Sequence, residues 1–357
     1  MRKMRKNRGI AYLLLIAMIF AVCMLSGCGS GGEDQTGGDT QQPSSQSSGS
    51  LNPSGEKVTI GWSERALAGT PWFEAMVSAA KELAAQNNIE LIVIDAQNKP
   101  DKQVADVEDL IARGVDGIVL DPCHPTSILT AVEQANAAGI PVICVNSAID
   151  TSVNPNARIE TIVTSDNYTI GYNVGYELGK KFDKPEANVV IMSGHMGDIE
   201  GWQRRSGFIA GFSEYQYEKF GAAKINILAQ RYAGDWDPDK ALTQMQDILV
   251  KFPKQIDILF SEGDAMALSC VTALKSAGET GVLVGSIDGQ LEAIEALKDG
   301  DIVAIGVNSA VETGKGGVEY IMKVLNGEKV NSRIYVPSPT ITQDNVDQYY
   351  KPGVPFL

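Results

Sequence analysis

Short apolar runs recur along this chain, and each ends in a polar residue that is followed by a helical pattern. At residues 282–289 an apolar run leads to Asp288 and Gly289, and a helical segment follows. Parallel strands end in this way at the carboxyl edge of an open α/β sheet, where ligands bind. The runs end at Ser63, Asp95, Asp121, Asn146, Asp166, Glu262, Asp288 and Asn308. A polar rim with few catalytic residue types favours a binding cleft over an active site.

The alternation of strands and helices occurs twice. The first series predicts strands at 58–63, 90–96, 117–122, 141–146 and 160–166, and helices at 71–86, 100–114, 128–139 and 168–182. The second predicts strands at 188–194, 225–232, 258–262, 282–288 and 303–308, and helices at 201–215, 238–251, 265–277, 291–298 and 311–325. Strand–helix–strand units of about 30 residues form right-handed βαβ connections. We therefore expect an α/β fold with two doubly wound, Rossmann-like parallel sheets, and the last helix and strand could return to the first sheet.

The N-terminus has the pattern of a secretory signal. Basic residues precede a nearly unbroken apolar stretch at 10–25. This stretch is shorter than the roughly 20 residues that span a bilayer, which argues against a transmembrane anchor. Residues 25–28, Leu-Ser-Gly-Cys, resemble a bacterial lipobox. The resemblance implies a signal peptide at 1–27, a lipid on the sulfur of Cys28, and attachment to the extracytoplasmic face of the cell membrane.

Residues 28–55 are expected to form a flexible linker behind the lipidated cysteine. Glycine, serine, glutamine and other polar residues dominate this stretch, so it cannot bury enough apolar surface to offset chain entropy. About 300 residues remain for folding, which is enough for two domains. The whole chain has a formal net charge of −14 and no basic stripe, and this argues against a nucleic-acid partner. Three cysteines beyond the N-terminus, Cys123, Cys144 and Cys270, do not form a disulfide framework, and we expect free thiols.

The sequence contains no recognisable catalytic motif. It lacks H-E-x-x-H, C-x-x-C, G-x-S-x-G, a Walker motif, and a G-x-G-x-x-G after the first strand. Its two histidines, His124 and His195, follow predicted strands and could line a cleft, but we interpret them as loop residues. Residues 235–239 (DWDPD) start like a calcium loop but lack its later ligands, so we expect Asp237 to cap a helix that begins at Pro238. We expect no enzyme activity, no cofactor and no metal.

Aromatic residues gather near the predicted strand ends. Trp62, Trp72 and Phe73 lie at or just after the first strand, and Trp202 and Trp236 lie at corresponding places in the second series. Aromatic faces suit the apolar C–H faces of a sugar ring, while planar polar groups take its hydroxyls. Packing in a core is the alternative. We favour ligand contact for Trp72, Phe73 and Trp236, and leave Trp202 open.

Residues 56 to about 335 resemble the type I periplasmic sugar-binding proteins, close to the ribose- and galactofuranose-binding members. The motifs that carry the resemblance are TPWF at 70–73, DAQN at 95–98, RGVD at 113–116, AGIPV at 138–142, TSDN at 164–167, GDAMA at 263–267 and VGSIDG at 284–289. The resemblance implies two lobes that are joined by three crossing segments at a hinge and close around one sugar. It assigns 56–165 and about 309–337 to the N-terminal lobe, and 166–308 and about 338–357 to the C-terminal lobe.

The resemblance also implies a set of ligand-binding residues. Trp72 and Phe73 come from the first lobe, and Arg204, Trp236, Asp288 and Asn308 come from the second lobe or its crossover. The chain departs from the family pattern at two places. Asn146-Ser147 stands where the family usually has Asp-Arg, and Glu262-Gly263 stands where many members have asparagine. We keep Asn146 and Glu262 in the predicted set, but the altered polar pattern makes the ligand of the nearest relatives an unsafe guess.

The resulting hypothesis is a solute-binding lipoprotein. It would capture a monosaccharide-like sugar or a polyol and deliver it to the permease of an ABC importer, as a monomer. The alternative is a sensory lipoprotein that presents its ligand to a chemoreceptor or a sensor kinase. A repressor core of the same lobe type is a third alternative, but a signal sequence stands where its DNA-binding helices would be.

Overall fold

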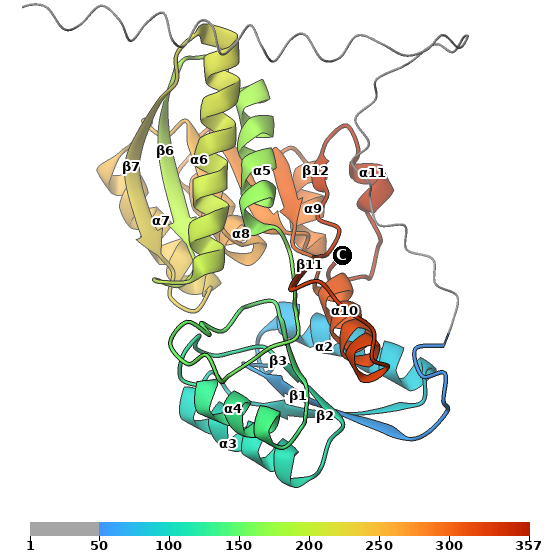
Figure 1. Cartoon of the computed structure of the whole chain (residues 1–357). Helices are drawn as coiled ribbons and strands as arrows, with labels where there is room; N and C mark the ends of the chain where they lie inside the picture. The colour runs from blue at the N-terminus through green and yellow to red at the C-terminus, as the bar shows by residue number, and fades with distance from the viewer. Residues whose placement is uncertain (1–49) are drawn as a thin grey trace, which may run out of the picture. The chain divides into compact units, whose positions relative to one another are not determined.

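The computed structural model describes residues 50–357, and the expected signal peptide, Cys28 and most of the linker lie outside this part. Its first half alternates strands and helices as predicted (Figure 1). The elements are β1 (Val58–Glu64), α2 (Pro71–Gln86), β2 (Ile89–Asp95), α3 (Pro100–Ala112), β3 (Gly117–Leu120), α4 (Leu129–Ala137), β4 (Val142–Val145) and β5 (Ile162–Thr164).

The second half repeats the alternation and adds short elements at its end. The elements are α5 (Asn167–Lys181), β6 (Glu186–Ser193), α6 (Ile199–Phe220), β7 (Lys224–Tyr232), α7 (Pro238–Lys251), β8 (Ile258–Ser261), α8 (Asp264–Ser276), β9 (Leu283–Asp288), α9 (Leu291–Lys298), β10 (Ala304–Val307), α10 (Ala310–Leu325), β11 (Arg333–Tyr335), β12 (Thr340–Thr342) and α11 (Val346–Tyr349). Every predicted strand and helix is present, and three short elements, β11, β12 and α11, were not predicted.

The strands form two six-stranded sheets with related orders. The first sheet has the order β11-β5-β4-β3-β1-β2, and the second has the order β12-β10-β9-β8-β6-β7. All pairs are parallel except β10 with β12. In each sheet the strand order reverses beside the first strand, β1 or β6, and ligands bind at such a switch point. The prediction of two doubly wound parallel sheets is confirmed.

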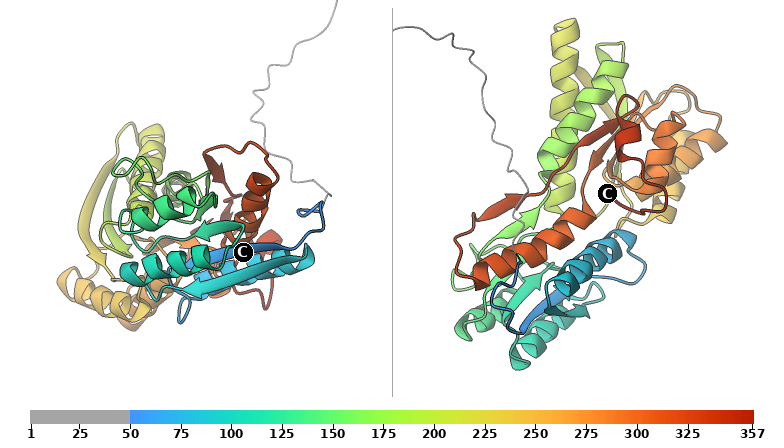
Figure 2. Two further views of the ribbon diagram at one scale, coloured as in Figure 1. Left: turned by 60° about the horizontal axis from the view of Figure 1, so that its bottom comes forward. Right: turned by 90° about the vertical axis from the view of Figure 1, so that its right-hand side faces the viewer.

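The chain crosses between the sheets at three places. It leaves β5 of the first sheet for α5, which packs against β9 and β10 of the second. It returns after β10, because α10 packs against α2, β3 and β4, and Figure 2 shows α10 beside α2. It crosses again between β11 and β12. The chain leaves β5 and β10 at their carboxyl ends, so the crossings lie at the carboxyl edges of both sheets.

Local side-chain interactions mark the start of some helices. Asp237 caps α7 as predicted, because its side chain accepts hydrogen bonds from the N–H groups of Asp239 and Lys240. Thr70 precedes α2 with Pro71 in the first turn, but its side chain makes no capping hydrogen bond. Its hydroxyl donates instead to the Leu67 oxygen at 2.6 Å. The helix begins at Pro71 as predicted, and the Thr70 hydroxyl bonds back to the preceding loop instead of to the first turn of the helix.

Helices α5 and α6 pack unusually closely through glycines. Gly171 and Gly175 on α5 face Gly207 and Gly211 on α6. A Cβ atom added at any of the four would overlap a main-chain oxygen of the facing helix. At Gly171 that oxygen belongs to Arg204. The two helices are therefore in backbone contact where α6 carries a predicted site residue.

The folded part begins slightly before residue 56. Leu51 packs against the core of the first sheet, and its N–H donates to Asn87 Oδ1 at 3.0 Å. Asn52 is 5% exposed. These two residues were placed in the expected linker, and they contact the folded part. Within residues 50–357, no helix has the length and apolar character needed to cross a bilayer.

Candidate ligand-binding site

Arg204 is held in the second half of the site by main-chain and side-chain partners. Its Nε donates to Asn167 Oδ1 at 2.8 Å, and its Nη1 donates to the Glu262 main-chain oxygen at 2.7 Å. The same Nη1 lies 3.4 Å from Asp288 Oδ1. The side chain is only 5% exposed. Arg204 is therefore a positioned, largely desolvated charge and not a solvated charge on a helix surface.

Trp236 lies over this guanidinium. Arg204 Cζ is 5.4 Å from the centre of the indole ring, which is a cation–π distance. Two glycines leave room for the ring. A Cβ on Gly194 would overlap it, and a Cβ on Gly263 would lie 3.3 Å from the ring and 3.3 Å from Asp288 Oδ2. An aromatic face and a carboxylate thus adjoin each other, as recognition of a polyhydroxylated ring requires.

Asp288 ends β9 in a strained backbone conformation. Its φ is 133°, in a region that residues other than glycine rarely adopt, and such strain occurs mostly at functional sites. The buried carboxylate of Asp264 holds the turn that follows. It accepts hydrogen bonds from Ser286 Oγ at 2.5 Å and from the N–H groups of Gly289 and Gln290 at 2.8 Å. Asp264 therefore holds the chain on both sides of Asp288.

The Asp288 carboxylate keeps capacity for a ligand. Asn308 Nδ2 donates to its Oδ1 at 3.2 Å, and Arg204 approaches the same oxygen. Burial raises the pKa of Asp288, and Arg204 and Asn308 oppose this shift. The side chain remains 18% exposed. Since a carboxylate offers about four lone-pair positions, Oδ2 can accept hydroxyl groups from a ligand.

Glu262 lies below the site and not in it. Its side chain has no exposed surface. Oε1 accepts hydrogen bonds from Ser193 Oγ and Arg205 Nη1, each at 2.9 Å, and Oε2 accepts one from the Gly194 N–H at 3.0 Å. The carboxylate thus fastens the ends of β6 and β8 to α6. The predicted ligand contact does not match this placement, because both oxygens are already engaged by the protein.

Trp72 and Phe73 form the aromatic part of the first half. They lie at the start of α2, with their rings edge to face and the centres 5.4 Å apart. Both are partly buried. Trp72 Nε1 donates to the main-chain oxygen of Asn308 at 2.9 Å, so this residue links the two halves of the site.

Asn146 lies at the end of β4 with a φ of 59°, which turns it out of the strand. Its Nδ2 reaches the two carboxylate oxygens of Asp121 at 3.3 and 3.4 Å. Asp121 and Glu64 are fully buried neighbours at the ends of β3 and β1. Burial raises the pKa of Glu64 well above its usual value and that of Asp121 to about 7. Asn146, which remains partly exposed, is thus hydrogen-bonded to one of two neighbouring buried acidic groups.

Arg65 is a site residue that the sequence reasoning missed. It follows β1 directly, and its Cζ lies 5.6 Å from the centre of the Phe73 ring. The only sequence signal was its place at a strand end, since nothing in the local pattern separates it from a solvated charge. The first half of the site therefore has its own guanidinium over an aromatic ring.

A small cavity of about 110 Å³ adjoins Asn146. Residues from both halves of the chain line it. These are Asn146, Ala148, Ile162, Thr164, Ser165, Asp166, Asn167, Ile199, Glu200, Gln203, Arg333 and Tyr335. The cavity connects the first-half residues to the start of α6, the helix that carries Arg204.

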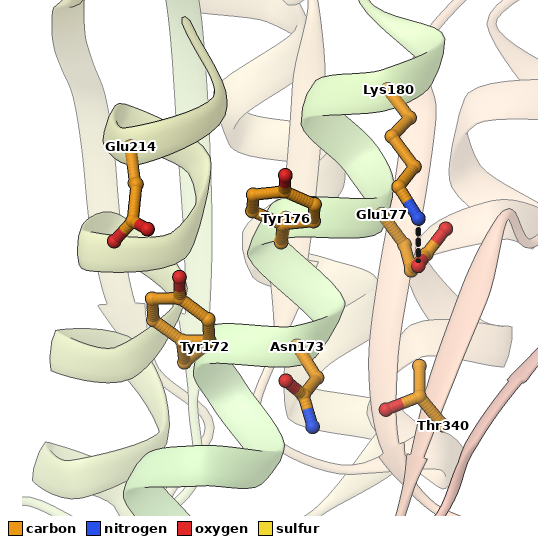
Figure 3. A pocket seen from close by; sticks show the side chains of 7 residues that line it. All are labelled: Tyr172, Asn173, Tyr176, Glu177, Lys180, Glu214 and Thr340. Atoms are coloured by element: carbon orange, nitrogen blue, oxygen red, sulfur yellow. Dashed lines mark hydrogen bonds and ion pairs between the residues drawn. The ribbon is translucent and has the colours of Figure 1, made fainter. Parts of the chain in front are cut away.

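A larger hollow of about 520 Å³ lies elsewhere, on α5, and Figure 3 shows its lining. Tyr172, Tyr176 and Lys180 project into it from α5, with Glu214 of α6 at one side and Thr340 of β12 at the other. None of the predicted site residues lines it. It is an open surface feature in which Glu177 and Lys180 form an ion pair.

The remaining predicted features divide between core and surface. Trp62 is fully buried and packs in the core of the first sheet, whereas Trp202 is 52% exposed on α6. Cys144 and Cys270 are buried free thiols, and Cys123 is partly buried and free. Within the part that the structure describes, no group of three or more histidine, cysteine or acidic side chains is placed to hold a metal ion.

A family model described as "Periplasmic binding protein domain" matches residues 66–329. The chain belongs to this family. This periplasmic binding protein is 32% identical over 288 residues to the ribose import binding protein RbsB of Bacillus subtilis (strain 168), with 81% of this chain and 88% of the relative covered.

Two solved structures are similar to this periplasmic binding protein. One is an ABC transporter periplasmic solute-binding protein from Actinobacillus succinogenes 130z with bound D-allose, at 30% identity and a TM-score of 0.74, covering 82% of this chain and 100% of that chain. The other is an ABC transporter solute-binding protein from Bacillus halodurans C-125 with bound myo-inositol, at 29% identity and a TM-score of 0.73, covering 82% and 97%. The expected family resemblance and two-lobe fold are confirmed, and the family is one of binding proteins, not enzymes.

Proposed function

We propose that this chain is an extracytoplasmic solute-binding lipoprotein that captures a monosaccharide-like sugar or a polyol and delivers it to an ABC importer. The observation that carries the proposal is the group formed by Arg204, Trp236 and Asp288 at the carboxyl edge of the second sheet. It offers a guanidinium, an aromatic face and a carboxylate with a free oxygen. These are the groups that match the hydroxyls and the C–H face of a sugar or polyol.

The relatives support this ligand class. One is a ribose import binding protein, and the two solved structures contain D-allose and myo-inositol; all three compounds are polyhydroxylated molecules without charge. In our proposal the ligand contacts are Trp72, Phe73, Asn146, Arg204, Trp236, Asp288 and Asn308, with Glu262 and Asp264 in supporting positions. The N-terminal lobe comprises 56–165 and about 309–337, and the C-terminal lobe comprises 166–308 and about 338–357.

The anchor and the delivery step are part of the same proposal. Cys28 carries the lipid, and the linker residues that follow it in the sequence tether the binding domain near a permease in the membrane. Replacing Cys28 by serine should leave a precursor that is neither lipidated nor cleaved. Membrane fractionation and the mass of the N-terminal peptide measure this, and processing at another residue without a lipid would refute the anchor.

Thermal unfolding in the presence of monosaccharides and polyols tests the ligand class. A ligand at about 100 times its Kd adds roughly 2.7 kcal/mol to the free energy of unfolding, so a true ligand raises the unfolding midpoint clearly. We expect one or a few closely related compounds to do so. A panel of pentoses, hexoses, alditols and cyclitols that leaves the midpoint unchanged would contradict the proposal.

Deletion of the gene separates delivery from sensing. If the chain serves an importer, the deletion should abolish high-affinity uptake of the radiolabelled ligand, and the Cys28→Ser variant should restore it poorly. Uptake that persists while chemotaxis or induced transcription is lost would favour the sensory alternative.

A further inference from the structure

We infer that Arg65 binds the ligand and supplies, from the end of β1, the first-half guanidinium of the site. This inference rests on the proposed function and extends it to a residue outside the predicted set. Asn146-Ser147 at the end of β4 provides no cationic side chain. Arg65 reaches the same region from a different strand. The first half of the site thus presents a guanidinium although β4 lacks one.

The main chain at Arg65 is fixed. Its carbonyl oxygen accepts a hydrogen bond from the Asn98 N–H at 2.6 Å and one from Cys123 Sγ at 3.7 Å. These partners belong to the segments that follow β2 and β3. The residue is therefore anchored among three strand ends at the switch point of the first sheet, where a ligand is expected.

The side chain, in contrast, has no hydrogen-bond partner. Among residues 50–357, the Arg65 guanidinium donates no hydrogen bond and makes no ion pair, although it is only partly exposed. Its face rests on Phe73, which holds the group in place without using its N–H donors. A guanidinium has five such donors and no acceptor. This is a preorganised donor group that awaits acceptor oxygens from outside the chain.

The charged groups around Arg65 indicate which kind of ligand oxygen its guanidinium binds. Burial alone would lower the pKa of the Arg65 guanidinium, but nearby carboxylates raise it above its usual value. These carboxylates belong to Asp121 in the first half and to Asp198 and Glu200 in the second. A phosphate or a sugar acid placed against Arg65 would lie near these acidic side chains. A neutral acceptor, a hydroxyl or a ring oxygen, fits beside these acidic groups, in line with the uncharged sugars or polyols of the proposed function.

The geometry also repeats the arrangement around Arg204. In each half a guanidinium lies over an aromatic ring, with Cζ-to-centre distances of 5.6 Å to Phe73 and 5.4 Å to Trp236. Two donors of this kind on the two halves can hold one ligand from both sides. Arg65 is therefore expected to contribute to ligand affinity and not to the stability of the chain without ligand.

Calorimetric titration of the purified chain with D-ribose, D-allose and myo-inositol tests the inference. The variants are Arg65→Met and Arg65→Lys, and the control is Arg113→Met, which removes an exposed arginine paired with Asp109 on α3. For each probe that binds the unaltered protein, we expect Arg65→Met to weaken binding about 10- to 100-fold. Arg65→Lys should restore only part of the affinity, because lysine lacks the planar fork. Arg113→Met should bind like the unaltered protein.

The outcomes separate the two proposals. Equal affinity of the unaltered protein and both Arg65 variants would overturn the role of Arg65 and leave the proposed function intact. No binding of any of the three probes, or of the wider panel of sugars and polyols, would overturn both. A loss of affinity accompanied by an equal loss in the unfolding midpoint would make Arg65 a structural residue and would also overturn its role as a ligand contact.

D-ribose 5-phosphate tests the assignment to neutral ligands. If Arg65 faces a neutral oxygen among three carboxylates, the phosphate ester should bind the unaltered protein more weakly than D-ribose does. Tighter binding of the ester that disappears in Arg65→Met would show an anion site and overturn the assignment to uncharged ligands.

Discussion

At the scale of single residues, Asp288 has the role that is easiest to isolate. Asp288→Ala removes the carboxylate that accepts ligand hydroxyls, and a charged acceptor contributes about 1.5–3 kcal/mol per hydrogen bond. We expect affinity to fall about 100-fold or more, and Asp288→Asn to retain part of it. Calorimetric affinity and the unfolding midpoint should be measured on the same protein. An unchanged affinity with a lower midpoint would show that Asp288 only holds the turn before α9.

The buried pair of Glu64 and Asp121 predicts a pH dependence of stability. Burial raises the pKa of Asp121 to about 7, above the value of about 3.9 in an unfolded chain. The folded state therefore binds this proton more tightly, so the stabilising contribution is complete below about pH 4 and is lost as the pH rises towards 7. Asp121→Asn removes the titrating group.

We expect the free energy of unfolding of Asp121→Asn to fall less between pH 4.5 and pH 7.5 than that of the unaltered protein. Denaturant unfolding at the two pH values measures the difference, and Asp247→Asn on the exposed side of α7 is the control. Parallel pH profiles for the unaltered protein and Asp121→Asn would contradict the assignment.

At the scale of elements, the contact between α5 and α6 positions Arg204. Gly171→Ala pushes against the Arg204 carbonyl of α6. Gly211, which lies about two turns beyond Arg204 on α6, faces the Tyr172 carbonyl of α5, and Gly211→Ala pushes against that carbonyl. Both changes overpack the same interface, which costs roughly 1–3 kcal/mol of stability. Only Gly171→Ala should also lower ligand affinity, by about tenfold, because it displaces the guanidinium. Equal affinity in the two variants, measured calorimetrically, would show that the helix contact does not position Arg204.

The elements themselves could be predicted largely from the sequence, because strand and helix periodicities differ and glycines mark the helix ends. The three elements that were missed are three or four residues long, too short to show a period. Side-chain direction at strand ends could not be predicted. Glu262 ends a predicted strand as Asp288 does, yet it is engaged by Arg205 below the site, and Arg65 enters the site although nothing in its neighbourhood of the sequence distinguishes it.

At the scale of the whole molecule, two sheets of the same topology bring their carboxyl edges to three chain crossings, and the site residues come from both. The hydrogen bond from Trp72 to the Asn308 oxygen joins the halves at one crossing. Segments that far apart in the sequence meet only through the order of the strands. The family resemblance could predict that these segments lie together, but the sequence could not show which side chains contact one another.

A crystal structure of the chain with the sugar or polyol that stabilises it most tests the central claim directly. The account predicts the ligand between the Phe73 and Trp236 rings, with hydroxyls within hydrogen-bond distance of Asp288 and an acceptor oxygen against Arg65. A ligand bound elsewhere, such as in the hollow on α5 beside Tyr172 and Tyr176, with the Asp288 region unoccupied, would contradict it.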